Sequence, residues 1–237
     1  MDPAATDAEI TGGTPVGRRV VLAMLGLGAG GVLFGKSIQD GLARVLSPKV
    51  AAYLPSGGRF RIYSVVGFLP RRSTTDYRLT VAGLVDRPLD LSFADLTALP
   101  PTSVTRDFQC VTGWRVPGVA WRGVKLADLL TAAGVQPAAK ALRFLCFDGE
   151  YTESLTLDQA NRDDVLVAYE MEGKPVSAAH GGPVRLFVGP MYGYKSAKWL
   201  DRIEVVDRVV DGFWEVRGYD TDAWVGRSNG RTDKPTT

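Results

Sequence analysis

The chain has 237 residues, of which 45% are hydrophobic and 23% are charged, and this balance excludes a wholly disordered chain. Its 28 basic and 26 acidic residues leave a net charge of +2, which excludes a strongly basic nucleic-acid-binding domain because phosphate neutralisation needs an excess of positive charge. Two cysteines and one histidine are too few for a disulfide-dense scaffold, an all-cysteine zinc site or a site that needs two histidines.

Residues 1–58 are predicted to form an N-terminal extension made of a disordered start, an export signal or signal anchor, and a linker. Arg18 and Arg19 stand before a short apolar run, which is the pattern of a twin-arginine export signal. Gly17 precedes the pair where Ser or Thr is usual, and no A-x-A cleavage site follows the run. An uncleaved anchor, with membrane association through residues 18–38, therefore stays open beside cleavage, and a buried core helix is the alternative.

A phosphate-binding pattern also lies within this extension. Gly30, Gly35, Lys36 and Ser37 satisfy G-x-x-x-x-G-K-S, the spacing of P-loop nucleotide hydrolases. Bulky apolar residues occupy the tip of this loop, where backbone N–H groups would have to surround the phosphates. The rest of the chain also lacks the regular alternation of strands and helices found in such proteins. The context therefore disfavours a nucleotide hydrolase, whose nucleotide binding would be lost in Lys36→Ala.

Residues 59–237 are predicted to form one domain with a C-terminal tail, built of short strands and turns with few helices. Ser92, with Asp95 three positions later, predicts the start of a short helix. Strands and short helices mixed without β-α-β regularity predict the α+β class. In chain order, strands are expected over residues 77–85, 102–111, 119–122, 141–147, 151–155, 165–169, 184–188 and 199–206, a helix over 126–133 that ends at Gly134, and a helical turn over 157–162.

Cys110 is the first residue that suggests chemistry, because a thiolate is a soft, charged donor that suits soft metals. Arg106 is close in sequence and could help to keep the sulfur ionised. The residues alone leave two other readings open, a disulfide with Cys146 or a buried free thiol. A disulfide is the default for two cysteines in an exported domain.

The second group of candidates combines glycines with cations. His180-Gly181-Gly182-Pro183-Val184-Arg185 is followed by Gly193-Tyr194-Lys195-Ser196. Glycines allow backbone N–H groups to approach an anion, Arg185 can grip a phosphate through two hydrogen bonds, and Lys195 adds a point charge. The alternative is a pair of ordinary surface turns with exposed cations and a structural His180.

No haem-attachment motif is present, and the G-x-G-x-x-G spacing occurs only within the apolar N-terminal run. A redox enzyme with this sequence would therefore exchange electrons with another protein or a diffusible acceptor.

Taken together, the two clusters resemble the sulfite oxidase-type molybdopterin domain. The resemblance covers roughly residues 59–225, with its motifs in order, and the most similar branch is that of single-domain bacterial proteins related to the exported methionine-sulfoxide reductase catalytic subunit. It is carried by Phe108-Gln109-Cys110-Val111-Thr112-Gly113-Trp114, the run from Trp121 to Leu130, His180–Leu186, Tyr192–Trp199, Tyr77–Val85, and the tail Gly212-Phe213-Trp214-Glu215 with Gly218-Tyr219.

The resemblance implies a mixed, β-rich fold that binds molybdopterin and molybdenum. Cys110 would be the protein thiolate on the metal, beside the dithiolene sulfurs of the cofactor. Arg185 would bind the phosphate end of the cofactor, and Gly193, Tyr194 and Lys195 would line the same pocket.

Several positions depart from the pattern of the reductase branch. His180 stands where that branch has an amide side chain, and both groups can form hydrogen bonds. Tyr63 and Ser64 fall where it has a Tyr-Glu pair, and Phe60 replaces a polar residue. Cys146 takes the place of a small hydroxyl residue, so the resemblance implies that it lines the cofactor pocket and is not a disulfide partner.

The function that the resemblance implies is oxygen-atom transfer that reduces an S- or N-oxide, either a small molecule or a protein-bound group. Electrons would come from an external donor such as a membrane haem protein or a quinone. Because the cofactor is inserted in the cytoplasm in this family, an exported member must cross the membrane folded, which the twin-arginine route permits.

Two alternatives stay open within the same fold. In the sulfite-oxidising branch the cysteine is followed by an Asn-Arg-Arg-type run, whereas Thr112-Gly113-Trp114-Arg115 follows it in this chain. An apolar Trp114 suits a neutral substrate better than a doubly charged oxyanion, although Arg115 is nearby. The other alternative is a non-catalytic binding module, which the departures at Phe60, Ser64 and Cys146 motivate.

Overall fold

The computed structural model describes residues 60–226. The predictions made for residues 1–58, including the export segment and the P-loop pattern, lie outside the described residues, and so does the proposed domain start at residue 59.

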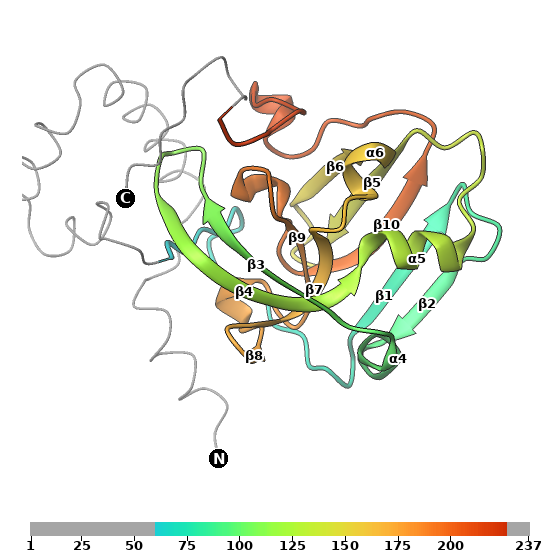
Figure 1. Cartoon of the computed structure of the whole chain (residues 1–237), viewed down its shortest axis with the longest axis horizontal. Coiled ribbons are helices and arrows are strands. Elements are labelled where there is room, and N and C mark those ends of the chain that lie inside the picture. Colours follow the sequence, from blue (N-terminus) through green and yellow to red (C-terminus); the bar gives the residue numbers. More distant parts are fainter. Residues whose placement is uncertain (1–59, 227–237) are drawn as a thin grey trace, which may run out of the picture.

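Two β-sheets form the body of the described part (Figure 1). The first sheet has the order β2 (Leu89–Ser92), β1 (Arg78–Gly83), β10 (Leu200–Val206), β5 (Ala141–Cys146) and β6 (Thr152–Thr156), and only its β1–β10 pair is parallel. The second sheet has the order β3 (Thr102–Gln109), β4 (Arg115–Lys125), β7 (Val165–Met171) and β8 (Lys174–Pro175), with β9 (Arg185–Val188) also paired to β7.

Short helices connect these strands, so the predicted α+β class is confirmed. They are α4 (Phe93–Ala98), α5 (Leu126–Ala133), α6 (Leu157–Ala160) and the 3-10 turns η1 (Ala178–His180), η2 (Gly193–Lys195) and η3 (Glu215–Arg217). The predicted start of α4 is confirmed by a capping box, in which Asp95 N donates to Ser92 Oγ at 3.1 Å and Ser92 N donates to Asp95 Oδ2 at 2.9 Å. Gly134 ends α5 in the left-handed conformation, as predicted.

The longest strand differs most from its prediction. β4 spans Arg115–Lys125, whereas only residues 119–122 were expected to be extended. Pro117 and Gly118 read as a turn in the sequence and have no register partner in β3, but β3 pairs with β4 on both sides of them, so the strand continues across a local irregularity. Long-range pairing also explains why the short strands β2 and β8 were not predicted from local pattern.

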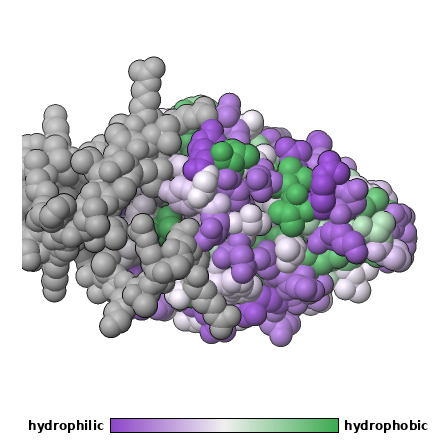
Figure 2. Space-filling model, turned by 90° about the horizontal axis from the view of Figure 1, so that it is seen from above, coloured by the Kyte–Doolittle hydropathy of each residue, from purple (hydrophilic) through white to green (hydrophobic). Residues whose placement is uncertain are grey.

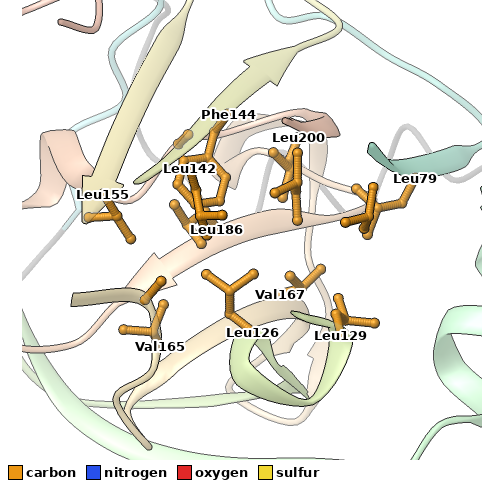
Figure 3. Close-up of a cluster of buried hydrophobic side chains, with 14 of the residues drawn as sticks. Leu79, Leu126, Leu129, Leu142, Phe144, Leu155, Val165, Val167, Leu186 and Leu200 are labelled. Carbon is orange, nitrogen blue, oxygen red and sulfur yellow. The ribbon is translucent and has the colours of Figure 1, made fainter. Parts of the chain in front are cut away.

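The main apolar core lies between the two sheets and includes α5 (Figure 3). In the close-up, Leu126 and Leu129 of α5 and Val167 of β7 point toward Leu142 of β5 and Leu200 of β10. In β1 the buried Leu79 and Val81 alternate with less buried residues. The fully buried β9 contributes Leu186 and Val188 to this core and Phe187 to a second, smaller apolar cluster. The outer surface seen in Figure 2 is mostly hydrophilic, with apolar side chains in separate small patches.

Among residues 60–226, no helix has the length and apolar character that crossing a membrane requires.

Candidate functional site

A cavity of about 160 Å³ opens between segments that lie far apart in the sequence. Its walls come from the chain before β1, the β3–β4 connection, the start of β6, the region from η1 to β9, the chain from η2 to β10, and the chain around η3. The lining residues are Phe60, Arg61, Ile62, Tyr63, Val65, Phe108, Cys110, Val111, Thr112, Trp114, Tyr151, Ala179, His180, Arg185, Gly193, Tyr194, Ser196, Lys198, Trp199, Trp214 and Tyr219.

The two clusters singled out in the sequence converge on this one cavity. The structure places Cys110, Tyr63, His180, Arg185, Gly193 and Tyr194 on its wall, and it places Ser64, Cys146 and Lys195 elsewhere. One thiol therefore lines the same cavity as several cations and aromatic rings.

Cys110 sits in a tight turn that follows β3. Its backbone N–H donates to Trp114 O at 2.9 Å, and Gly113 N donates to Cys110 O at 3.0 Å, so the turn holds the sulfur at the cavity wall. Thr112 Oγ1 donates to Cys110 Sγ at 3.2 Å. Burial raises the pKa of the Cys110 thiol, although the Thr112 hydrogen bond and the charge of Arg61 oppose that shift. A bound metal ion would therefore have to displace the thiol proton.

Three backbone carbonyls hold Arg185 in place. Its guanidinium donates to His180 O and to Ser196 O, each at 2.7 Å, and to Leu186 O at 3.2 Å. Burial lowers the pKa of Arg185 to about 10, so the side chain stays charged at neutral pH. Arg185 thus ties η1 to the chain after η2 and adds a fixed positive charge to the cavity.

Lys198 is one of two cavity cations, with Arg61, that the sequence analysis did not assign to the site. Its ammonium donates to the carbonyl of Tyr63 and lies 4.4 Å from the centroid of the Trp199 ring. Burial, followed by the charge of Arg185, lowers the pKa of Lys198 to about 7. The sequence could have pointed to Lys198, because this residue lies within the Tyr192–Trp199 segment that carried the family resemblance.

Lys195 does not line the cavity, contrary to the prediction. Its ammonium is fully buried and contacts Glu153 Oε1 at 2.5 Å and Glu215 Oε1 at 2.7 Å. An ammonium held between two carboxylates is neutralised and cannot also serve a cofactor phosphate. The local sequence could not reveal this, because both carboxylates come from distant segments.

Ser64 and Cys146 also lie away from the cavity wall. Ser64 is buried, and its hydroxyl donates to Phe68 O at 2.5 Å, which closes a local turn. Cys146 ends β5 within the main apolar core. Both cysteines are free thiols, so the disulfide alternative is wrong for this structure.

The glycines after His180 serve packing and not ligand approach. A Cβ on Gly181, whose φ is +99°, would lie 2.5 Å from Lys198 Cβ, and Trp199 N donates to Gly181 O at 2.8 Å. A Cβ on Gly182 would lie 1.8 Å from Val176 O. Gly181 therefore lets the η1 turn pack against the segment that presents Lys198, and Gly182 lets the same turn pack against Val176.

His180 is a neutral member of the wall. Burial, followed by the charges of Arg185 and Lys198, lowers the pKa of His180 to about 3. Its ring meets Phe60 edge-on with centroids 4.8 Å apart. The imidazole can therefore form hydrogen bonds but adds no charge at neutral pH.

Aromatic side chains line the same cavity as Cys110. The Phe108 and Trp114 rings stack with centroids 6.0 Å apart, and Phe60 packs against both. Burial, with a smaller contribution from Cys110, raises the pKa of Tyr63 and raises the pKa of Tyr219 to about 12. Both phenols keep their protons at neutral pH and can donate hydrogen bonds beside the thiol.

The charge balance of the wall fits an anionic cofactor. Arg61, Arg185 and Lys198 line the cavity, and no Asp or Glu of the described residues does. The same residues contain no group of three or more His, Cys, Asp and Glu that could hold a metal ion. One thiol with three cations suits a group that carries a negative phosphate and supplies most of the metal ligands itself, which molybdopterin does through its dithiolene sulfurs.

A family model settles the assignment, because the oxidoreductase molybdopterin-binding domain matches residues 66–214, more than half of the chain. The chain belongs to this family. It is a molybdenum-dependent oxidoreductase with molybdopterin as its cofactor.

Curated relatives agree with this assignment. The chain is 39% identical to the uncharacterised oxidoreductase YuiH of Bacillus subtilis over 61% of this chain and 73% of that protein. It is 33% identical to a sulfite oxidase of Arabidopsis thaliana (60% and 45% covered) and 31% identical to YedZ1 of Azospira oryzae, a candidate subunit of a protein-methionine-sulfoxide reductase (64% and 56% covered).

A solved structure shares the fold. The sulfane dehydrogenase SoxCD from Paracoccus pantotrophus is 28% identical with a TM-score of 0.60, over 65% of this chain and 44% of the SoxCD chain. The chain thus spans about half the length of several relatives that it matches, and it has the sulfite oxidase-type molybdopterin-binding fold that the sequence predicted.

If Lys198 supplies charge to the cofactor phosphate, Lys198→Met should lower the molybdenum and pterin content of purified protein by about tenfold, a cost of about 1.4 kcal/mol in binding. Lys198→Arg keeps the positive charge, so this variant should retain most of the molybdenum and most of the pterin. Elemental analysis and the fluorescence of the oxidised pterin measure the two quantities. Equal content in Lys198→Met and the wild type would contradict this role.

The buried position of Lys195 predicts a large loss of stability in Lys195→Met. Two buried carboxylates would be left without their cation, at a cost of about 3–5 kcal/mol in unfolding free energy. Lys125→Met is the matched control, because the Lys125–Asp163 pair is exposed and should contribute little. Urea unfolding measures both variants, and similar losses in the two would contradict the assignment.

Proposed function

We propose that the protein reduces a neutral S-oxide or N-oxide by oxygen-atom transfer. The observation that carries this proposal is the aromatic wall beside Cys110, formed by Trp114, Phe108 and Phe60. A neutral, partly apolar oxide gains from burial against such rings, whereas a doubly charged oxyanion loses solvation there. The name of the Azospira relative supports a sulfoxide substrate.

The reaction balances as an oxide plus two electrons and two protons giving the reduced compound and water. Molybdenum held by molybdopterin and a cysteine thiolate supplies the two-electron exchange and the oxygen transfer. The protein's own contribution is to orient the substrate: the protonated hydroxyls of Tyr63 and Tyr219 can donate to the oxide oxygen, and Trp114 shields the site from water.

Oxidation of sulfite or a related anion is the second candidate. Arg61 favours it, because this cation lines the cavity and its charge acts on Cys110. The names of the Arabidopsis sulfite oxidase and of SoxCD point the same way. Arg115 gives less support, since it pairs with Asp107 at 3.2 Å and does not line the cavity.

Steady-state assays of the metal-loaded protein with sulfoxides, N-oxides and sulfite separate these candidates and the non-catalytic module. We expect oxide reduction with a chemical electron donor, its loss in Cys110→Ser, and a change of less than about threefold in Arg61→Gln. Sulfite oxidation that collapses in Arg61→Gln would support the second candidate instead. Full metal loading without turnover of any of these compounds would favour a binding module.

The electron donor and the cellular location belong to the same proposal. Reduction of an oxide needs an external electron donor, and a membrane haem protein on the outer face of the membrane would meet this need. The twin arginines at Arg18 and Arg19 support export of the folded, cofactor-loaded protein, either free or held through residues 18–38.

Replacement of Arg18 and Arg19 together by Lys should keep the protein in the cytoplasm, because the twin-arginine route reads the guanidinium pair. Cell fractionation followed by immunodetection measures this, with the wild type as reference. Unchanged export of the double variant would contradict the proposed route. Membrane pellets washed at high salt distinguish an anchored protein from a soluble one.

A further inference from the structure

Three buried side chains form an ion cluster behind the cavity wall, which we name the Lys195 cluster. Lys195 Nζ lies 2.5 Å from Glu153 Oε1 and 2.7 Å from Glu215 Oε1, and at most 1% of any of the three side chains is exposed. Burial raises the pKa of Glu153 well above its usual range, and Lys195 opposes that shift. The cofactor argument uses none of these residues, so their arrangement requires another explanation.

Each member of the cluster adjoins a residue of the cavity wall. Glu153 follows the wall residue Tyr151 by two positions in β6, and Lys195 directly follows Tyr194 in η2. Glu215 directly follows Trp214, another wall residue. One buried ammonium therefore joins three segments that build the wall.

The third segment, which we name the C-terminal arm, comprises residues 211–226. Its Trp214 and Tyr219 lie on the cavity wall with ring centroids 5.1 Å apart, and Cys110 lines the same cavity. Phe213 of the arm stacks on Tyr151, and Tyr194 Oη donates to Asp220 O at 2.6 Å.

The energetics of the Lys195 cluster indicate that it fixes the position of the C-terminal arm more than it adds stability. A buried ion group is often no more stable than apolar residues of similar volume, because desolvation offsets the Coulomb attraction. Its geometry is nevertheless demanding, since an ammonium shared by two carboxylates tolerates little displacement of either one. Aromatic stacking can slide with small loss of energy, whereas the Glu215–Lys195 contact fixes where the arm begins.

We propose that Glu215, Lys195 and Glu153 are positioning residues that set the C-terminal arm against the cavity and thereby control substrate binding beside Cys110. This inference rests on the proposed function for the identity of the substrate, but the placement of the arm does not depend on it. The cluster acts through Trp214 and Tyr219 and does not itself touch the substrate.

Glu215→Leu is the sharpest variant, because it leaves Lys195 and Glu153 as a charge-matched pair and so should still fold. In the metal-loaded enzyme we expect KM for the oxide to rise about tenfold with kcat changed by less than about threefold and with unchanged molybdenum content. Glu215→Gln keeps an oxygen acceptor for Lys195 but lacks the carboxylate charge, so it should raise KM less than Glu215→Leu does. Glu170→Leu, at the exposed Arg122–Glu170 pair, is the matched control and should leave KM unchanged.

Hydrogen exchange of the metal-loaded protein supplies a readout that needs no substrate. Amides of residues 212–220 should exchange at least about tenfold faster in Glu215→Leu, and those of the core strand β7 should not change. Faster exchange in the arm without turnover of any oxide would refute the proposed function and leave the arm assignment standing. Unchanged exchange in the arm, or an unchanged KM, would overturn the positioning role.

If Glu215→Leu fails to fold, the Lys195→Arg and Glu215→Gln variants give the same test, because both keep the charge or the acceptor and alter only the geometry. Each should then show faster exchange confined to the arm and a raised KM. Wild-type exchange and KM in both would overturn the proposal.

Discussion

The site depends first on one buried guanidinium. Arg185 donates to the carbonyls of His180 and Ser196, which belong to two turns separated by β9. With these bonds in place, His180 and Lys198 face the same space as Cys110, which comes from the turn after β3. A neutral or shorter side chain at position 185 would leave buried carbonyls without donors. Arg185 is therefore required to hold the two turns together, whether or not a ligand is bound.

The second constraint is electrostatic. Three cations and no carboxylate of the described chain line the cavity, and burial holds the pKa of Lys198 near 7. Such a site is costly when it contains only water and favourable when a bound anion supplies the missing charge. Aromatic rings lie close to these cations, since the Arg185 guanidinium lies 5.5 Å from the centroid of the Phe108 ring, so the cavity combines positive charge with apolar surface.

Much of this architecture could be read from the sequence, for identifiable reasons. Local signals gave the capping box of Ser92, the end of α5 at Gly134 and the strands with clear alternation, because these depend on neighbouring residues. The span of β4 could not be read, since β3 pairs with β4 on both sides of Pro117-Gly118 and the strand continues across this irregularity. The same limit applies to the site: the sequence analysis assigned Lys195 to the cavity and gave Lys198 no role, because the two carboxylates that neutralise Lys195 come from distant segments.

The parallel pairing of β1 with β10 has a consequence for biogenesis. These strands are adjacent in the first sheet although almost the whole domain separates them along the chain, so loop-closure entropy delays their docking until late in folding. The cavity is likewise assembled from the residues before β1 and those after β10. A nascent chain therefore cannot offer a finished pocket before the wall residues up to Tyr219 have been synthesised, and insertion of molybdopterin must follow their synthesis.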